Sequence, residues 1–307
     1  MRTIHVLEVD DLDAHQLATI LEIAQKWKSD PTSVPSTLLA GQGVAALFEK
    51  PSARTRSSTE MAVVTLGGHP IYIRPEEVGF DVRETVEDVA RTLACYSRII
   101  AARVDEHRTL ERMAASVDVP VVNLLSDRAH PCQALADLLT IQEQLGSVAG
   151  KRLAFVGDGH NVASSLAFAS ALSGLDLVVS SPSGYELDPV VVDRARNLGA
   201  TLELVADPLD AVREADVVYT DVWTSMGQES EAAIRGEAFA PYVVDKALMQ
   251  LARPDALFMH CLPAHRGEET TAEVIDGPGS VVWEQAANRM HAARALFALL
   301  VGWGETS

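Results

Sequence analysis

The run Glu49–Arg56 has the highest density of residues able to bind an anion. It follows the apolar run Gly43–Phe48 and precedes a helical pattern, so a strand is expected to end and a helix to begin there. The open N–H groups of a first helical turn and the positive end of its dipole favour an anion. Hydroxyls from Ser52 and Thr55 and the planar guanidinium of Arg54 would add hydrogen bonds to phosphate oxygens. The run therefore predicts an oxyanion site.

The same run also has a purely structural interpretation. Ser52 is a good N-cap residue, and Arg56 can pair with Glu60 one helical turn later. For Ser52 and Arg54 we favour a binding role, and for Arg56 we favour the structural ion pair.

His130 stands directly before Pro131 and Gln133, at the start of a long helical pattern that follows another expected strand. Proline is well tolerated in a first helical turn, so His130 is expected at the helix start, facing a cleft. A histidine in that position is more often a cap than a catalyst. Arg103, at the end of the strand expected over 98–103, is ambiguous in the same way, since a surface ion pair would also explain it.

The turn Gly157-Asp158-Gly159-His160-Asn161 follows an apolar run and precedes a helix, as in a dinucleotide-binding site. The third glycine of that motif is replaced by Val162, and the next strand ends in serines rather than in an acidic residue for a ribose hydroxyl. We therefore predict a tight strand-to-helix turn that leaves Asn161 free to bind a ligand carboxylate. A nicotinamide oxidoreductase is disfavoured.

Two further runs carry reactive side chains at expected strand ends. The run Asp221–Gly227 would present a carboxylate and hydroxyls to a cation, although a simple turn would look similar. The run His260–His265 contains Cys261, but no C-x-x-C or other matching ligand pair accompanies it, so no metal site is expected. The polar stretch from Gly227 to about Pro241 is expected to be a loop and a possible lid.

Short β-branched runs alternate twice with helical patterns, which indicates βαβ units and parallel sheets. The sequence predicts an α/β fold with two doubly wound parallel-sheet domains joined by interdomain helices. The expected strands and main helices are Gly43–Phe48, Pro70–Ile73, Arg98–Arg103, Pro120–Leu124, Arg152–Val156, Asp176–Ser180, Thr201–Val205, Asp216–Thr220 and Ala256–His260, and Asp13–Lys28, Ser52–Leu66, Glu84–Tyr96, Arg108–Val117, Pro131–Leu145 and Trp283–Trp303.

Composition limits the possible classes of protein. The 307 residues carry a net charge of −18, which disfavours a nucleic-acid-binding protein. The apolar run Ala295–Trp303 is too short to span a membrane, and no secretory signal is evident at the start, so a cytoplasmic protein is expected. The widely spaced Cys95, Cys132 and Cys261 suit reduced thiols, with Cys95 and Cys132 expected to be buried.

Four motifs together resemble the ornithine carbamoyltransferases: Ser52–Arg56, His130–Gln133, Asp221–Gly227 and His260–Pro263. The resemblance covers essentially the whole chain, and the last two motifs are similar to those of the ornithine enzymes rather than to their aspartate, acetylornithine or putrescine relatives. It implies transfer of a carbamoyl group from carbamoyl phosphate to L-ornithine, without cofactor or metal, by a homotrimer or a multiple of trimers. It implies a carbamoyl-phosphate domain over residues 1–146, joined by the C-terminal helix 284–307, and an ornithine domain over 147–283.

The resemblance also implies roles for individual residues. Those resembling catalytic groups are Arg54, Arg103, His130, Asp221 and Cys261, and Arg54, Arg103, His130 and Arg289 are expected to supply positive charge. Those resembling carbamoyl-phosphate ligands are Ser52, Ala53, Arg54, Thr55, Arg103, His130, Gln133, Cys261, Leu262 and Arg289. Those resembling ornithine ligands are Asn161, Asp221, Ser225 and Met226. A cis bond is implied between Leu262 and Pro263.

The chain departs from the family pattern at three places: Ala53 replaces a threonine, His160 replaces an asparagine, and the loop 78–84 lacks its common form. Transfer to a related amine such as putrescine or lysine, and a silent paralogue that only senses its ligands, are the alternatives to the ornithine enzyme.

Overall fold

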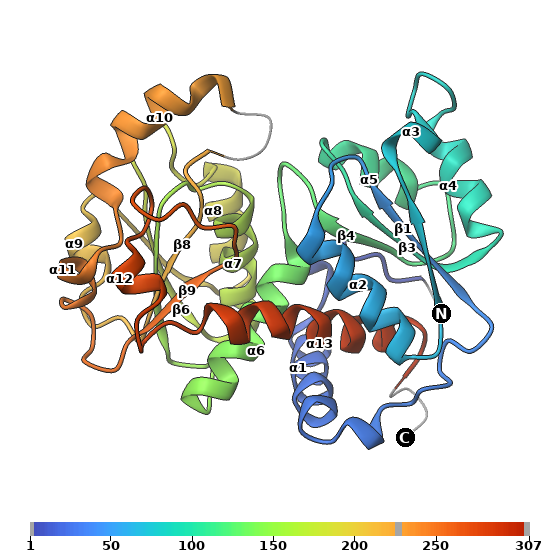
Figure 1. The fold of residues 1–307 in the computed structure, drawn as a ribbon, viewed down its shortest axis with the longest axis horizontal. Helices are drawn as coiled ribbons and strands as arrows, with labels where there is room; N and C mark the ends of the chain where they lie inside the picture. Colours follow the sequence, from blue (N-terminus) through green and yellow to red (C-terminus); the bar gives the residue numbers. More distant parts are fainter. Residues whose placement is uncertain (1–2, 225–228, 304–307) are drawn as a thin grey trace. The chain divides into compact units, whose positions relative to one another are not determined.

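The computed structural model describes residues 3–224 and 229–303 and divides into two compact units (Figure 1). The first unit comprises Met1–Leu139 and Ala287–Ser307, and the second comprises Thr140–Ala286. Each unit has its own parallel sheet with flanking helices, a 4-stranded sheet in the first and a 5-stranded sheet in the second. The predicted fold class is confirmed.

The sheet of the first unit has the order β2-β1-β3-β4. Its central strands are apolar on both faces, as expected where helices cover a parallel sheet from both sides. The strands are β1 (Gly43–Phe48), β2 (His69–Ile73), β3 (Ser97–Arg103) and β4 (Val121–Leu125).

The helices of the first unit begin at good capping residues. Asp13 caps α1, Ser52 caps α2 and Thr85 caps α4, each accepting a backbone N–H of the first turn. Apolar side chains of α4 and α5 form a core with one face of β1 and β3. The helices are η1 (Val9–Asp11), α1 (Ala14–Ser29), η2 (Pro31–Ser33), α2 (Ala53–Thr65), α3 (Pro75–Val78), α4 (Val86–Ala94) and α5 (His107–Ala114).

The sheet of the second unit has the order β7-β6-β5-β8-β9. The chain runs outward from β5 to β7 and then returns to β8 on the other side of β5. The carboxyl ends of β5 and β8 therefore flank the topological switch point, where ligands bind in open α/β sheets. The strands are β5 (Arg152–Val156), β6 (Asp176–Ser180), β7 (Thr201–Val205), β8 (Val217–Thr220) and β9 (Leu257–His260).

A core of buried apolar side chains, among them Phe239 and Phe258, joins this sheet to the helices on one side. The helices of the second unit are α7 (Asn161–Ser173), α8 (Pro189–Asn197), α9 (Pro208–Ala211), η3 (Glu229–Glu231), α10 (Ala232–Phe239), η4 (Ala240–Tyr242), α11 (Lys246–Met249) and α12 (Ala272–Ile275).

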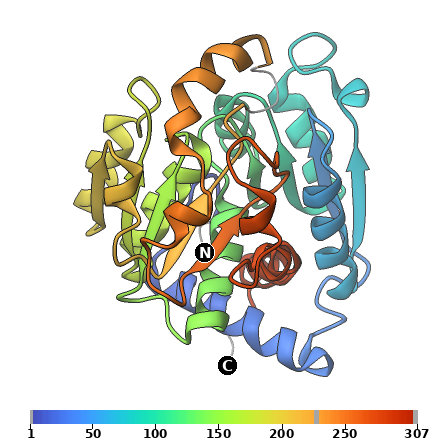
Figure 2. The same ribbon diagram turned by 60° about the vertical axis from the view of Figure 1, so that its left-hand side comes forward.

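Two helices cross the boundary between the units. α6 (Pro131–Leu145) begins in the first unit, and α13 (Val282–Leu300), seen nearly end-on in Figure 2, begins in the second. The first unit is consequently built from both ends of the chain. Over the described residues, no helix is long and apolar enough to cross a membrane.

Two expectations about the fold are wrong. The stretch expected to be a loop as far as Pro241 contains helix α10 between η3 and η4, because Phe239 anchors it in the apolar core. Cys95 is exposed rather than buried, since it follows the last residue of α4 at the surface, whereas Cys132 is buried as expected.

Candidate active site

Helix α2 begins shortly after β1 ends, as the sequence predicts. The hydroxyl of Ser52 accepts the backbone N–H of Thr55 at 3.3 Å and so caps the helix. Ala53 and Arg54 are exposed in the first turn, whereas Thr55 points inward and is only 2% exposed. Arg56 pairs with Glu60 at 2.7 Å, which confirms its structural role.

Thr55 is the meeting point of a buried cluster of donors from four elements. Arg289 of α13 donates from Nη2 to the Thr55 hydroxyl at 2.7 Å and from Nη1 to Oε1 of Gln133, on α6, at 2.5 Å. Arg103, at the end of β3, donates to the same hydroxyl at 3.5 Å. Because Arg103 is only 8% exposed, a surface ion pair does not account for it.

His130 precedes α6 and belongs to the same electrostatic environment. Burial lowers the pKa of His130 well below its usual value, and the charges of Arg289 and Arg103 lower it further. The lowered pKa favours the neutral imidazole and gives no support to the expectation that His130 supplies positive charge. It can serve as a hydrogen-bonding group.

The donor cluster, defined as Thr55, Arg103, His130, Gln133 and Arg289, suits a bound oxyanion. Buried guanidinium groups form strong, directional hydrogen bonds to phosphate and carbonyl oxygens. Arg54 forms no hydrogen bond or ion pair with the described residues, so the structure does not link it to this cluster.

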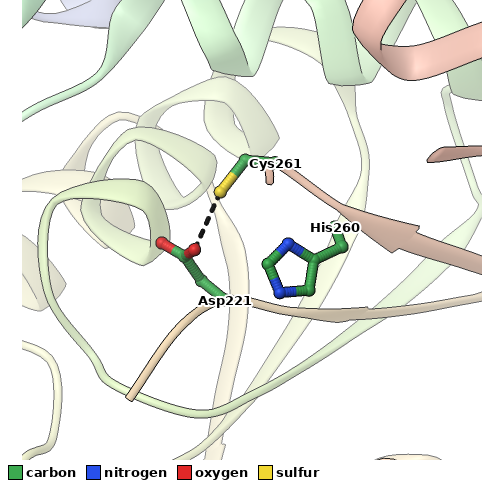
Figure 3. A group of neighbouring side chains, drawn as sticks. All are labelled: Asp221, His260 and Cys261. Atoms are coloured by element: carbon green, nitrogen blue, oxygen red, sulfur yellow. Dashed lines mark hydrogen bonds between the residues drawn. The ribbon is translucent and has the colours of Figure 1, made fainter. Parts of the chain in front are cut away.

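The second unit carries an acid and a thiol in direct contact (Figure 3). The thiol of Cys261, directly after β9, donates to Oδ1 of Asp221, directly after β8, at 2.9 Å. Burial raises the pKa of the Asp221 carboxyl, although nearby His260 and the thiol hydrogen bond partly oppose this. The pair lies at the carboxyl ends of neighbouring strands, where the sequence predicts both residues.

His260 braces the turn that follows β9. Its Nε2 lies 3.1 Å from Oε1 of Glu269, and its Nδ1 accepts the backbone N–H of Leu262 at 2.8 Å. Leu262 has a φ of 62° and a cis bond to Pro263, as the resemblance implies. Asp221, His260 and Cys261 are close enough to share an ion, but both ring nitrogens of His260 already hold this turn.

Arg235 of α10 connects two strand ends, and the sequence gives no sign of this role. Its Nη1 donates to Asp158 at 2.7 Å and to the carbonyl oxygen of Trp223 at 3.0 Å. Its guanidinium also lies 4.8 Å from the ring centroid of Tyr185. The link joins the turn after β5 to the segment after β8, across the topological switch point.

Two backbone N–H groups of the glycine turn after β5 form hydrogen bonds within the protein. The N–H groups of Gly157 and Gly159 donate to the carbonyl oxygens of Ser180 and Tyr185 at 2.9 and 2.8 Å. A Cβ on Gly159 would lie 2.3 Å from the backbone nitrogen of Leu187, so only glycine fits. These amides are engaged and cannot bind a pyrophosphate, in agreement with the predicted tight turn.

Three predicted ornithine ligands remain to be located. Asn161 is the first residue of α7, directly after the glycine turn. Ser225 and Met226 lie outside the described residues.

Comparisons with known proteins agree with this arrangement. Residues 4–143 match the family model "Aspartate/ornithine carbamoyltransferase, carbamoyl-P binding domain", and residues 149–300 match "Aspartate/ornithine carbamoyltransferase, Asp/Orn binding domain". The anabolic ornithine carbamoyltransferase of Pyrococcus furiosus is 48% identical over 302 residues, 97% of this chain and 96% of the relative. The ornithine carbamoyltransferase of Acidothermus cellulolyticus is 49% identical over 301 residues, with the same coverage.

Solved structures give the same result. The ornithine carbamoyltransferase from Pyrococcus furiosus superposes with a TM-score of 0.93 at 48% identity, covering 97% of both chains. The enzyme from Thermus thermophilus superposes with a TM-score of 0.89 at 44% identity, covering 97% of this chain and 98% of the other. The chain belongs to the aspartate/ornithine carbamoyltransferase family.

Proposed function

We propose that this protein transfers the carbamoyl group of carbamoyl phosphate to the δ-amine of L-ornithine, giving L-citrulline and phosphate. The neutral amine attacks the carbamoyl carbon directly and forms a C–N bond. The resulting tetrahedral oxyanion collapses as the C–O bond to phosphate breaks, and the amine gives up a proton. No covalent enzyme intermediate is needed, and the anabolic relative supports the biosynthetic direction.

In this proposal the first unit binds carbamoyl phosphate. The helix start formed by Ser52, Ala53, Arg54 and Thr55 would hold the phosphate with Arg289. Arg103, His130 and Gln133 would donate to the carbonyl oxygen as negative charge develops there. Loss of one such donor typically costs on the order of 10²–10³ in kcat.

The second unit binds ornithine in this proposal. Asp221 would pair with the α-ammonium group, and Asn161, Ser225 and Met226 would complete the site. Cys261 and Leu262 would lie beside the reacting amine and the carbamoyl group. The hydrogen bond between Cys261 and Asp221 supports a shared role, because the thiol can pass its own proton to the carboxylate, 2.9 Å away, as it takes one from the amine.

The protonation state of ornithine sets a large part of the barrier. A lysine-like amine has a pKa of about 10.4, so making it neutral at pH 7 costs about 4.6 kcal/mol. A pocket that desolvates the amine lowers its pKa and therefore that cost, whereas a carboxylate next to the δ-amine would raise both. Asp221 is therefore assigned mainly to the α-ammonium group.

The observation that carries the proposal is the convergence of Thr55, Arg103, Gln133 and Arg289 in one buried cluster. The test is steady-state formation of citrulline or its analogues from carbamoyl phosphate with ornithine, putrescine, lysine and acetylornithine. We expect kcat/KM for ornithine to exceed that for the other amines by at least tenfold. Preference for another amine, or no carbamoyl transfer to any of them, would overturn it.

We also infer a homotrimer, or a multiple of trimers, in the cytoplasm. The motif resemblance supports the trimer, and light scattering of the purified protein at micromolar concentration tests it. Cys95, Cys132 and Cys261 form no disulfide bonds among the described residues, which supports a reducing compartment.

A further inference from the structure

Helix α6 carries an acidic residue that the reaction described above does not use. Asp137 follows Gln133 by four residues, so both side chains lie on the same face of the helix. Both are fully enclosed, at 0% and 1% exposure, in a helix that is otherwise largely apolar. Burying a carboxyl group is costly unless hydrogen bonds compensate.

The two side chains form a hydrogen bond with a definite direction. Nε2 of Gln133 donates to Oδ1 of Asp137 at 2.8 Å, while Oε1 of Gln133 accepts from Arg289 at 2.5 Å. A guanidinium can only donate, and a carboxylate can only accept. Only one orientation of the Gln133 amide satisfies both partners, because the reversed amide would face donor with donor and acceptor with acceptor.

We propose that Asp137 is a positioning residue for the oxyanion site. It holds the Gln133 amide with its oxygen toward Arg289, and Gln133 in turn fixes the guanidinium that also donates to Thr55. Asp137 acts through Gln133 and does not itself touch the substrate. The identity of the ligand as carbamoyl phosphate rests on the proposed function.

The hydrogen bonds run in one direction, from Arg289 to Gln133 and from Gln133 to Asp137, which explains why an acidic residue is present at position 137. Without an acceptor at 137, the amide of Gln133 is free to rotate, and Arg289 loses a partner that holds one arm of its fork. The anion then binds more weakly, because the side chains of Gln133 and Arg289 must be ordered when it binds.

The experiment compares Asp137→Val, which removes the acceptor at nearly constant volume, with Asp137→Asn, which keeps an oxygen acceptor. We expect the KM for carbamoyl phosphate to rise roughly tenfold in the valine variant and less than about threefold in the asparagine variant. The KM for ornithine should stay within about twofold in both. Asp137→Ala replaces the valine variant, with the same expectations, if the latter does not fold.

A double-mutant cycle separates positioning from general stability. In the background of Gln133→Met, adding Asp137→Val should leave the KM for carbamoyl phosphate unchanged, because the intermediary is already gone. Asp127→Ala, which removes a carboxyl that accepts the N–H of His107 at 2.7 Å in the same unit, is the matched control and should leave both KM values unchanged.

The outcomes distinguish this inference from the proposed function. If the wild type makes citrulline but Asp137→Val leaves the KM for carbamoyl phosphate unchanged, raises both KM values equally or adds its full effect to Gln133→Met, the inference is wrong. If the wild type transfers no carbamoyl group, the proposed function is wrong. The inference is then tested by calorimetric binding of inorganic phosphate, which Asp137→Val should weaken and Asp137→Asn should preserve.

Discussion

At the scale of single residues, the fork of Arg289 is the most sensitive part of the donor cluster. Arg289→Lys replaces two directed hydrogen bonds with a single point charge, which cannot reach Thr55 and Gln133 together. We expect the KM for carbamoyl phosphate to rise roughly 10- to 100-fold. Arg91→Lys, at an exposed arginine paired with Asp88, is the control and should behave as the wild type in the same steady-state assay.

The pH profile reports the state of the nucleophile. Because the ornithine amine must lose a proton, kcat/KM for ornithine should rise with pH, up to about tenfold per unit between pH 6 and 9. His130 should add no step near pH 6.5, since burial and the neighbouring arginines hold its pKa well below that value. A profile that is flat over this range, measured at saturating carbamoyl phosphate, would contradict the proposed role of the free amine.

Residue types near strand ends could be predicted from the sequence, whereas their partners could not. Thr55, Arg103 and His130 follow apolar runs, and parallel strands bring such ends to one edge of a sheet. Asp137 lies in a predicted helix and Arg235 in a stretch expected to be a loop, and nothing in the neighbouring sequence shows that Gln133 or Trp223 will face them. The lowered pKa of His130 depends mainly on burial and, to a lesser extent, on Arg289 and Arg103, which are distant in the sequence.

At the scale of elements, the start of α2 serves both stability and binding. Ser52→Ala removes the cap on Thr55, and Thr85→Ala removes the matching cap on Asp88 of α4. Each should lower the free energy of unfolding by about 1 kcal/mol. Only Ser52→Ala should raise the KM for carbamoyl phosphate, as urea titration and steady-state kinetics on both variants can show. Equal KM values would restrict Ser52 to capping.

We expect helix α10 to affect the binding of ornithine through Arg235. Arg235→Gln leaves Asp158 without its buried partner and loosens the segment after β8 that begins with Asp221. We expect the KM for ornithine to rise about tenfold with the KM for carbamoyl phosphate unchanged. Arg253→Gln, at a half-exposed arginine that pairs with Asp216, provides the control. An unchanged ornithine KM in Arg235→Gln would show that the link is only structural.

The strands and long helices could be predicted to within a few residues, because their apolar periodicity is strong. Helix α10 could not, since it is short and Gly236, a poor helix former, interrupts it. Its stability comes from Phe239 in the core and from the contacts of Arg235. The short helices α3, α9, α11 and α12 could not be predicted either, because a single turn is too short to show a helical period.

At the scale of the whole molecule, the net charge of −18 coexists with a site for a phosphate. Binding depends on the local field rather than on total charge, and buried Arg103 and Arg289 contribute positive charge to that field in the first unit.

Stability should fall in mild acid because buried histidines resist protonation. Burial lowers the pKa of His107 below its usual 6.5, whereas the unfolded chain keeps the usual value. Below pH 6.5 the unfolded state binds more protons, so the free energy of unfolding decreases as pH falls. The melting temperature should drop between pH 7.5 and 5.5, by roughly 2–4 °C for each kcal/mol lost.

Calorimetry on two variants checks the assignment. His107→Gln should show a smaller drop over this pH range than the wild type. His15→Gln, at an exposed histidine of α1, should show the full drop. An identical drop in all three proteins would exclude His107 as a source of acid sensitivity.

The route of the chain has a consequence for biosynthesis. Thr55, Arg103 and Gln133 are translated early, but Arg289 belongs to a segment made after the entire second unit. At about 5–20 residues per second, the ribosome delivers this last partner many seconds after the others. The donor cluster therefore cannot be complete before residue 289 has been translated, and a premature stop before codon 289 yields a cluster that lacks Arg289.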